Sequence, residues 1–176
     1  MKEMGIFGLM IPEEYGGLGE SLLTYALCVE EIARGWMSVS GIVNTHFIVA
    51  YMLMQHGTEE QKAYFLPKMA AGEIRGAFSM SEPHCGSDVS AIKSKAVRDG
   101  DDYVVNGQKI HVSTMPGADV LAVSAKIATA DGTKPTMILL RVPTNLPGVS
   151  SSLMEQMGAR AHRLGIVDFR DVRIPV

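Results

Sequence analysis

The sequence predicts an α+β protein of two domains, a helical amino-terminal part followed by a small antiparallel β-barrel. Apolar residues recur at helical spacing in the first part, and strand-like runs separated by turn signals make up the second. The chain has 176 residues, of which 47% are hydrophobic and 20% charged, which is ordinary for a chain that buries a core. We therefore expect domains at residues 1–74 and 75–176.

Two helices are expected first. Apolar residues follow three- and four-residue steps from Leu22 to Gly35, and glycine suits the end of a helix. Ser38 is a good first residue for a second helix, which Gly57 closes. Because few polar residues interrupt the second helix, we expect neighbouring segments to cover it on several sides.

A third helix is expected to follow directly. Thr58 and Gln61 have the spacing of a capping box, in which each side chain bonds to the backbone of the other residue. Proline has no backbone N–H to continue a helix, so Pro67 is expected to interrupt this one.

The second domain is expected to consist of strands joined by turns. Tyr103–Val105 and Lys109–Ser113 flank Asn106-Gly107, a dipeptide that is typical of a β-hairpin turn. Other strands are expected at residues 119–125, 136–142 and 167–174, with turns at Asp99-Gly100, Asp131-Gly132 and Pro147-Gly148. This pattern is typical of a small barrel or sandwich.

Composition excludes several classes of function. A net charge of −3 and scattered basic residues predict no nucleic-acid partner. The longest apolar stretch, residues 47–54, is too short to span a membrane, and no leader is apparent. Cys28 and Cys85 form no CxxC pair. We therefore expect a soluble protein of a reducing compartment, the cytoplasm or, in a eukaryote, the mitochondrial matrix.

Several familiar motifs are also missing from the sequence. The five histidines show no metal-ligand spacing and no Cys/His cluster is apparent, so no metal site is expected. Neither GxGxxG nor a P-loop occurs, and no GxSxG elbow supports a hydrolase.

The richest polar segment is residues 78–88. A strand is expected to end at Glu82-Pro83, and Gly86 can adopt a positive φ in the following loop. Backbone N–H groups and three serine hydroxyls could form a donor-rich rim for an anion or a polar ring (Ser79, Ser81, Ser87). The alternative interpretation is that this loop forms a simple turn, in which the side chain of Ser87 or Asp88 caps the backbone.

A second candidate is the strand segment at residues 111–114. Alternation places His111 and Ser113 on one face and Val112 on the other. An imidazole beside a hydroxyl could line a planar ligand, or these side chains could simply lie on the solvent face of a barrel strand.

Several segments together, in order along the chain, resemble the acyl-CoA dehydrogenase family. These are a Gly-rich loop, the entry to the middle domain, a flavin-binding signature, a flavin-facing strand and the closing segment of the middle domain (residues 8–19, 57–72, 80–88, 106–113 and 169–175). The resemblance covers nearly the whole chain and implies the family's helical amino-terminal and β-rich middle domains.

The resemblance implies FAD as cofactor. Phe78, Met80 and Ser81 would line the pyrimidine side of the flavin ring, where donors stabilise charge on the reduced flavin. Ser113 takes the position of a Thr or Ser whose hydroxyl approaches flavin N5.

Gly86 and Ser87 would border the flavin pyrophosphate and, as the substrate-binding position at Ser87, the thioester end of acyl-CoA. His111 stands where the family usually has a tryptophan packed on the flavin, and His84-Cys85 replaces small residues. These departures affect flavin affinity and redox tuning and crowd the pyrophosphate position.

In such enzymes a carboxylate removes the α-proton while the β-hydrogen leaves as hydride to flavin N5. No glutamate of this sequence matches the motif of that base, which is expected in a carboxy-terminal helical domain absent from these residues. No catalytic residue is therefore assigned, and turnover by these residues alone is not expected. The expected partners are acyl-CoA, an electron-transfer flavoprotein or similar acceptor, and further subunits of a homo- or hetero-oligomer.

Two alternatives remain open from the sequence. The chain could be a non-catalytic partner subunit that completes another chain's flavin or acyl-CoA site. It could also belong to an acyl-CoA oxidase or a flavin-dependent hydroxylase on the same scaffold.

Overall fold

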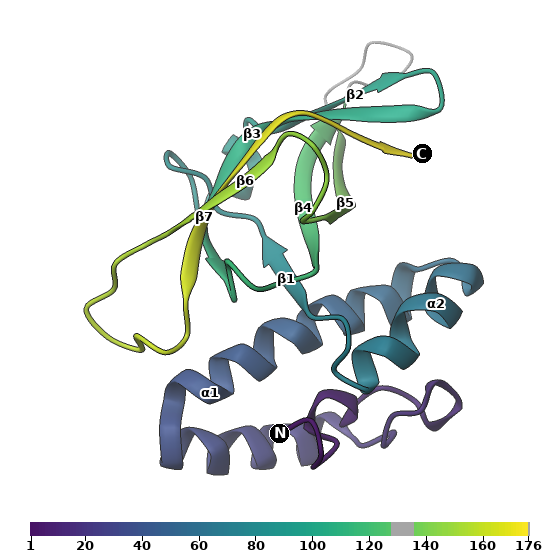
Figure 1. The fold of residues 1–176 in the computed structure, drawn as a ribbon, viewed down its shortest axis with the longest axis vertical. Helices are drawn as coiled ribbons and strands as arrows, with labels where there is room; N and C mark the ends of the chain where they lie inside the picture. Colours follow the sequence, from purple (N-terminus) through teal and green to yellow (C-terminus); the bar gives the residue numbers. More distant parts are fainter. Residues whose placement is uncertain (128–135, 176) are drawn as a thin grey trace. The chain divides into compact units, whose positions relative to one another are not determined.

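The computed structural model describes residues 1–127 and 136–175 (Figure 1). They form two compact units, one of Met1–Ala77 with Gln156–His162 and one of Phe78–Glu155 with Arg163–Val176. The first is helical and the second is built on a sheet, which confirms the predicted fold class. The predicted division at residue 74 remains a prediction in its exact position.

The longest helix, α1, runs from Leu22 to His56. Ser21 caps it by accepting a hydrogen bond from the backbone N–H of Thr24 at 3.1 Å. Trp36 has non-helical angles, φ −160° and ψ 98°, so α1 consists of two helical pieces. The expected break between two helices at residues 35–38 is confirmed, although no loop separates them.

Helix α2, Glu59–Ala70, begins with the predicted capping box, because Thr58 and Gln61 each bond to the other's backbone. The prediction for Pro67 is wrong, since α2 continues past it to Ala70. Proline removes only one helical hydrogen bond, and it does so on the exposed side of α2. Met69, which follows it, is fully buried and stabilises the last turn.

Two 3₁₀ turns, Ile6–Gly8 and Glu13–Tyr15, precede the helices. Their loop is closed by backbone bonds such as Leu18 N–H to Gly8 O at 2.8 Å. The core of this unit gathers apolar side chains from the loop and both helices: Leu9, Ile11, Val43, Phe47, Val49, Ala50, Phe65, Leu66 and Met69.

Helix α1 is long and apolar enough to cross a membrane by length and composition. The stretch at residues 47–54 that seemed too short is thus part of a longer helix. In the most apolar window 44% is buried inside the protein. One such helix among the described residues is weak evidence for a span, because core helices of soluble proteins and signal sequences have the same length and composition.

The second unit is a curled sheet in the order β1-β4-β2-β3-β7-β6, with β5 paired to β4 (Figure 1). Its strands are β1 Gly76–Ser79, β2 Lys95–Asp99, β3 Asp102–Ser113, β4 Val120–Ile127, β5 Thr136–Pro143, β6 Val149–Leu153 and β7 Leu164–Pro175. The pairings β2–β3, β3–β7, β4–β5 and β6–β7 are antiparallel, whereas β2 and β4 pair in parallel. The sheet is therefore mixed rather than wholly antiparallel.

The predicted hairpin turn at Asn106-Gly107 is wrong, because β3 runs through it. The register of β3 against β7 shifts between Val105 and Gly107, which marks a bulge. The Asn106 amide donates to the Asp171 carboxylate at 3.0 Å, and its oxygen accepts from Asp171 N–H at 2.9 Å. Pairing with a distant strand outweighed the local turn preference.

Two other predicted turns are confirmed. Gly100, with φ +63°, lies in the turn between β2 and β3, and Gly148, with φ +87°, precedes β6. Strand β6 itself was not predicted. The expected turn at Asp131-Gly132 lies outside the described residues.

Candidate functional site

The loop after β1 begins with a tight turn. Glu82 N–H donates to Cys85 O at 2.8 Å, and Cys85 N–H donates to Glu82 O at 3.1 Å. A 3₁₀ turn, Val89–Ala91, follows before β2. Strand β1 ends at Ser79, three residues before the predicted end, and proline occupies the second position of the turn.

A buried ion pair anchors this loop to β3. The Glu82 carboxylate accepts from Lys109 Nζ at 2.8 Å and from the backbone N–H groups of Lys93 and Ser94 at 2.7 and 2.9 Å. Glu82 is 3% exposed and Lys109 0%. Lys109 also donates to Met80 O at 3.0 Å, so Lys109 joins the loop to β3 at two points.

Both members of the pair, the Glu82 carboxylate and the Lys109 ammonium, are charged. Burial raises the pKa of Glu82, but hydrogen bonds from Lys109 and the loop backbone outweigh burial and hold this pKa to about 2. Burial lowers the pKa of Lys109, and the bond to Glu82 opposes that change. A buried carboxylate and ammonium remain ionised only because each satisfies the other.

Sequence reasoning missed this pair. From the sequence, Glu82 was placed at the end of a strand and Lys109 within another strand, and neither was paired with a partner. Lys109 stands inside a strand-like run, and a buried lysine needs an oppositely charged partner. That position was the signal from which a buried ion pair could have been predicted.

The structure brings the two predicted site segments together. Ile110 N–H donates to Ser81 O at 2.9 Å, which joins the loop after β1 to β3. A Cβ placed on Gly86 would meet only the Ser81 hydroxyl within 4 Å, at 3.9 Å. Ser81 and Gly86 therefore lie together, with room beside the glycine.

The register of β3 against β7 shifts a second time between Lys109 and Val112, so His111 lies within this bulge and Ser113 just beyond it. His111 is exposed with φ +56°, and its N–H donates to the Met154 sulfur at 3.4 Å. Val112 is fully buried, whereas Ser113 is half-buried. The left-handed backbone at His111 interrupts the regular alternation.

The remaining predicted residues differ in exposure. Phe78, Met80 and Ser81 are half-buried, whereas Gly86 and Ser87 are exposed. Strand alternation puts Phe78 and Met80 on the face opposite to buried Ala77 and Ser79.

Asp88 does not cap the backbone of the 3₁₀ turn that it precedes, although the expected simple turn allowed this. Its carboxylate accepts a hydrogen bond from the Ser90 hydroxyl instead. The Asp88 carboxylate is therefore bonded to a side chain of the same loop and not to the loop backbone.

His84 and Cys85, the departures from the family pattern, lie against the ion pair. His84 Nε2 is 3.1 Å from Ala91 O and 3.4 Å from Glu82 Oε2. The ligating atoms of Glu82, His84 and Cys85 all lie within 4.8 Å of one another. Histidine spacing alone missed this group, because its three members are of different chemical types.

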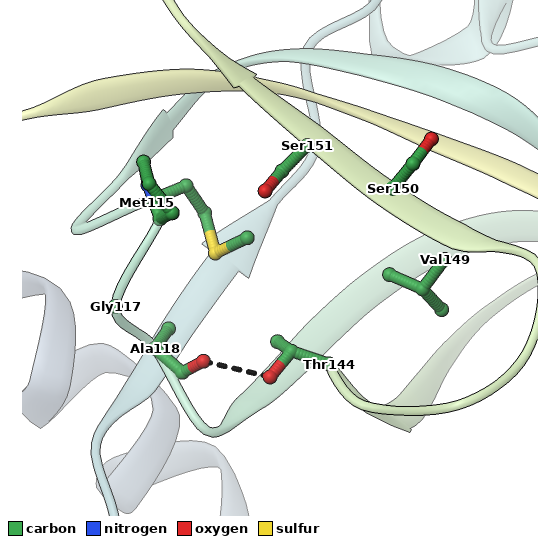
Figure 2. A pocket seen from close by; sticks show the side chains of 8 residues that line it. Met115, Gly117, Ala118, Thr144, Val149, Ser150 and Ser151 are labelled. Atoms are coloured by element: carbon green, nitrogen blue, oxygen red, sulfur yellow. Dashed lines mark hydrogen bonds between the residues drawn. The ribbon is translucent and has the colours of Figure 1, made fainter.

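A separate pocket of about 220 Å³ opens at the end of β3, and the predicted site residues do not line it. Figure 2 shows the Met115 side chain reaching toward its middle, with Thr144 donating to Ala118 O at 2.8 Å. The lining consists of Met115, Pro116, Gly117, Ala118, Thr144, Val149, Ser150 and Ser151.

Comparison with known families gives two matches that together span most of the chain. Residues 1–73 match the acyl-CoA dehydrogenase N-terminal domain, and residues 77–172 match the acyl-CoA dehydrogenase middle domain.

Known proteins of similar sequence and structure agree. Glutaryl-CoA dehydrogenase of Desulfococcus multivorans is 36% identical, over 99% of this chain and 46% of that protein. The acyl-CoA dehydrogenase structure from Geobacillus kaustophilus is 35% identical with a TM-score of 0.90, over 99% of this chain and 47% of that one. Glutaryl-CoA dehydrogenase from Mycobacterium smegmatis in complex with FADH2 is 28% identical with a TM-score of 0.91, over 99% and 44%. The chain spans about half the length of these relatives.

Proposed function

This chain belongs to the acyl-CoA dehydrogenase family, and we propose that it forms part of an FAD-dependent enzyme that desaturates the α,β bond of an acyl-CoA thioester. The names of its relatives, which include a glutaryl-CoA dehydrogenase and an FADH2 complex, support this proposal. The substrate's acyl group is left open, because the relatives act on different acyl-CoA thioesters by name.

One observation carries the proposal. The Ile110–Ser81 hydrogen bond places the signature loop beside the strand segment that resembles the family's flavin-facing strand. The two segments are far apart in the sequence, but they lie side by side in the folded sheet unit and together form one surface. The buried Glu82–Lys109 pair fixes that surface.

The residues on this surface fit a flavin. Phe78, Met80 and Ser81 would hold the pyrimidine side of the ring, and the Ser81 hydroxyl and nearby N–H groups would stabilise negative charge there. Ser113, only half-buried, would direct its hydroxyl to N5. Bound FAD would supply the acceptor for the hydrogen that leaves the β-carbon.

The exposed residues fit the outer parts of the cofactor. Gly86, where a Cβ would meet only the Ser81 hydroxyl at 3.9 Å, and exposed Ser87 would border the pyrophosphate and the thioester end of acyl-CoA. His111 is exposed, so its imidazole is available to pack on the ring as a smaller replacement for tryptophan. The His84 imidazole is held by Ala91 and Glu82.

We assign no catalytic base to these residues. Glu82 is the buried carboxylate of the loop, and it accepts hydrogen bonds from Lys109 and two backbone N–H groups. These bonds hold its pKa to about 2, so Glu82 is a poor proton acceptor. The family's base would come from the carboxy-terminal helical domain. Acyl-CoA, an electron-transfer flavoprotein or similar acceptor, and further subunits are the proposed partners.

The test uses the full-length product of the gene that encodes these residues. The purified protein should carry flavin absorbance, which should bleach when an acyl-CoA is added without oxygen. Ser113→Ala and Ser81→Ala should each lower the rate of bleaching by about 100-fold, the usual loss for one transition-state donor. Ser152→Ala, at an exposed serine of β6, is the matched control and should leave the rate unchanged.

The outcomes separate the alternatives. A folded protein that takes up no FAD overturns the proposal. Flavin uptake only after mixing with a second chain indicates a partner subunit, and rapid oxygen consumption with acyl-CoA indicates an oxidase or hydroxylase.

A further inference from the structure

The turn Glu82–Cys85 carries three different metal-ligating groups at one point. The Glu82 carboxylate, the His84 imidazole and the Cys85 thiol have their ligating atoms within 4.8 Å of one another. Two backbone hydrogen bonds between Glu82 and Cys85 close the turn and fix the spacing of its side chains. None of these three side chains is among the proposed flavin contacts.

Two of the three atoms already have tetrahedral spacing. His84 Nε2 lies 3.4 Å from Glu82 Oε2. Bonds from Zn²⁺ to nitrogen and oxygen are about 2.0–2.2 Å, so tetrahedral ligands stand roughly 3.3–3.6 Å apart. The 3.4 Å separation of these two atoms is therefore that of two ligands of one tetrahedral zinc ion.

Hydrogen bonds hold the Glu82 carboxylate in one orientation, which favours metal binding. Lys109 Nζ, Ser94 N–H and Lys93 N–H donate to Glu82 and fix its orientation, which is the usual role of groups around a metal ligand. His84 must exchange its contact with Ala91 O for the metal.

The charges permit a divalent ion. Lys109 donates to Glu82, Met80 O and Ser124 Oγ, so its ammonium is fully hydrogen-bonded and stays in place. With the Cys85 thiolate and the Glu82 carboxylate, the site contributes two negative charges against one from Lys109. That positive charge will weaken binding relative to a site without it.

Access and ligand type define the metal. The His84 side chain is 36% exposed and Cys85 is partly exposed, so an ion can enter from solvent. We propose that Glu82, His84 and Cys85 form a zinc site with a water molecule as the fourth ligand. A thiolate and an imidazole together favour Zn²⁺ over hard cations such as Mg²⁺.

The test is metal titration of the reduced, metal-free protein. Calorimetry should give one Zn²⁺ per chain, and Co²⁺, used as a coloured substitute, should give a thiolate charge-transfer band. Cys85→Ser and His84→Ala should each weaken Zn²⁺ affinity by at least about tenfold. Cys28→Ser is the matched control, because Cys28 is the other cysteine of these 176 residues, and this change should leave Zn²⁺ affinity unaltered.

The proposal is overturned by the absence of stoichiometric binding, by a missing thiolate band, or by affinity that survives both Cys85→Ser and His84→Ala. His84→Ala changes a partly exposed side chain, so it keeps the test decisive should Cys85→Ser fail to fold. Flavin content is measured separately, so failure of the zinc site and failure of the proposed function are distinguishable.

Discussion

Lys109 Nζ lies 2.8 Å from Glu82 Oε1, and both side chains are buried in the sheet unit. Lys109→Met would leave the Glu82 carboxylate buried without its counter-ion. Loss of one partner of a buried pair costs about 3–5 kcal/mol of unfolding free energy, which urea unfolding at neutral pH will measure. A change within 1 kcal/mol, taken as roughly the value of an exposed pair, contradicts this account.

Two controls separate the pair from general disruption. Lys109→Met combined with Glu82→Gln removes both charges and should be less destabilising than Lys109→Met alone. Arg173→Gln removes an exposed ion pair with Asp99, and it should leave unfolding nearly unchanged.

Gly107 should not tolerate a side chain. Its φ is +155°, and a Cβ there would lie 2.2 Å from Ser94 Oγ and 2.9 Å from Ser94 Cα. Gly107→Ala should therefore lower thermal stability, by about 1–3 kcal/mol for the backbone conformation alone. Gly158→Ala, where a Cβ meets nothing within 4 Å, is the matched control. Equal melting temperatures for the two variants would contradict the bulge.

His46 should make the helical unit sensitive to acid. It is 1% exposed and packs edge-on against Phe7, with ring centroids 5.1 Å apart. Burial lowers the pKa of His46 from 6.5 to about 4, and the nearby charge of Arg75 acts in the same direction. Below pH 6.5 the unfolded chain takes up a proton that the folded chain refuses until about pH 4.

The stability from neutral His46 is therefore complete above pH 6.5 and is lost as the pH falls toward 4, by about 3 kcal/mol in total. Urea unfolding at pH 7 and at pH 4.5 should show this loss. His46→Phe keeps an aromatic ring and removes the titration, so its stability should fall less over that interval. Parallel curves for the two proteins would refute the assignment.

The capping box of α2 gives a smaller, local effect. Thr58 Oγ1 accepts from Gln61 N–H at 3.2 Å, and Gln61 Oε1 accepts from Thr58 N–H at 3.0 Å. Thr58→Ala should destabilise the protein by about 1 kcal/mol, whereas Thr58→Ser keeps the acceptor and should cost little. Chemical unfolding of both variants provides the comparison.

The sequence was sufficient where the deciding contacts are close along the chain. The capping box joins residues three apart, and Gly100 and Gly148 adopt the positive φ that their turns require. Ordered motifs also identified the family, which the two matched domains confirm. The same motifs named the candidate site residues, whose roles remain predictions.

The sequence was misleading where a distant partner decides. Asn106-Gly107 has the chemistry of a hairpin turn, yet pairing with β7 makes it a bulge, with Asn106 bonded to Asp171. Pro67 was expected to interrupt a helix that in fact continues to Ala70, with Met69 buried in its last turn. In the first place strand pairing outweighed a local turn preference, and in the second the helix tolerated a proline that costs about 3 kcal/mol relative to alanine.

By itself, then, the sequence determined that helices precede strands, where α2 begins, and the family. Only the tertiary structure decided that Lys109 would meet Glu82, 27 residues away, and that Ile110 would hold Ser81. The physical reason is that burying a charged side chain is unfavourable unless an opposite charge lies beside it. That meeting depends on the pairing of strands, which spacing along the chain does not encode.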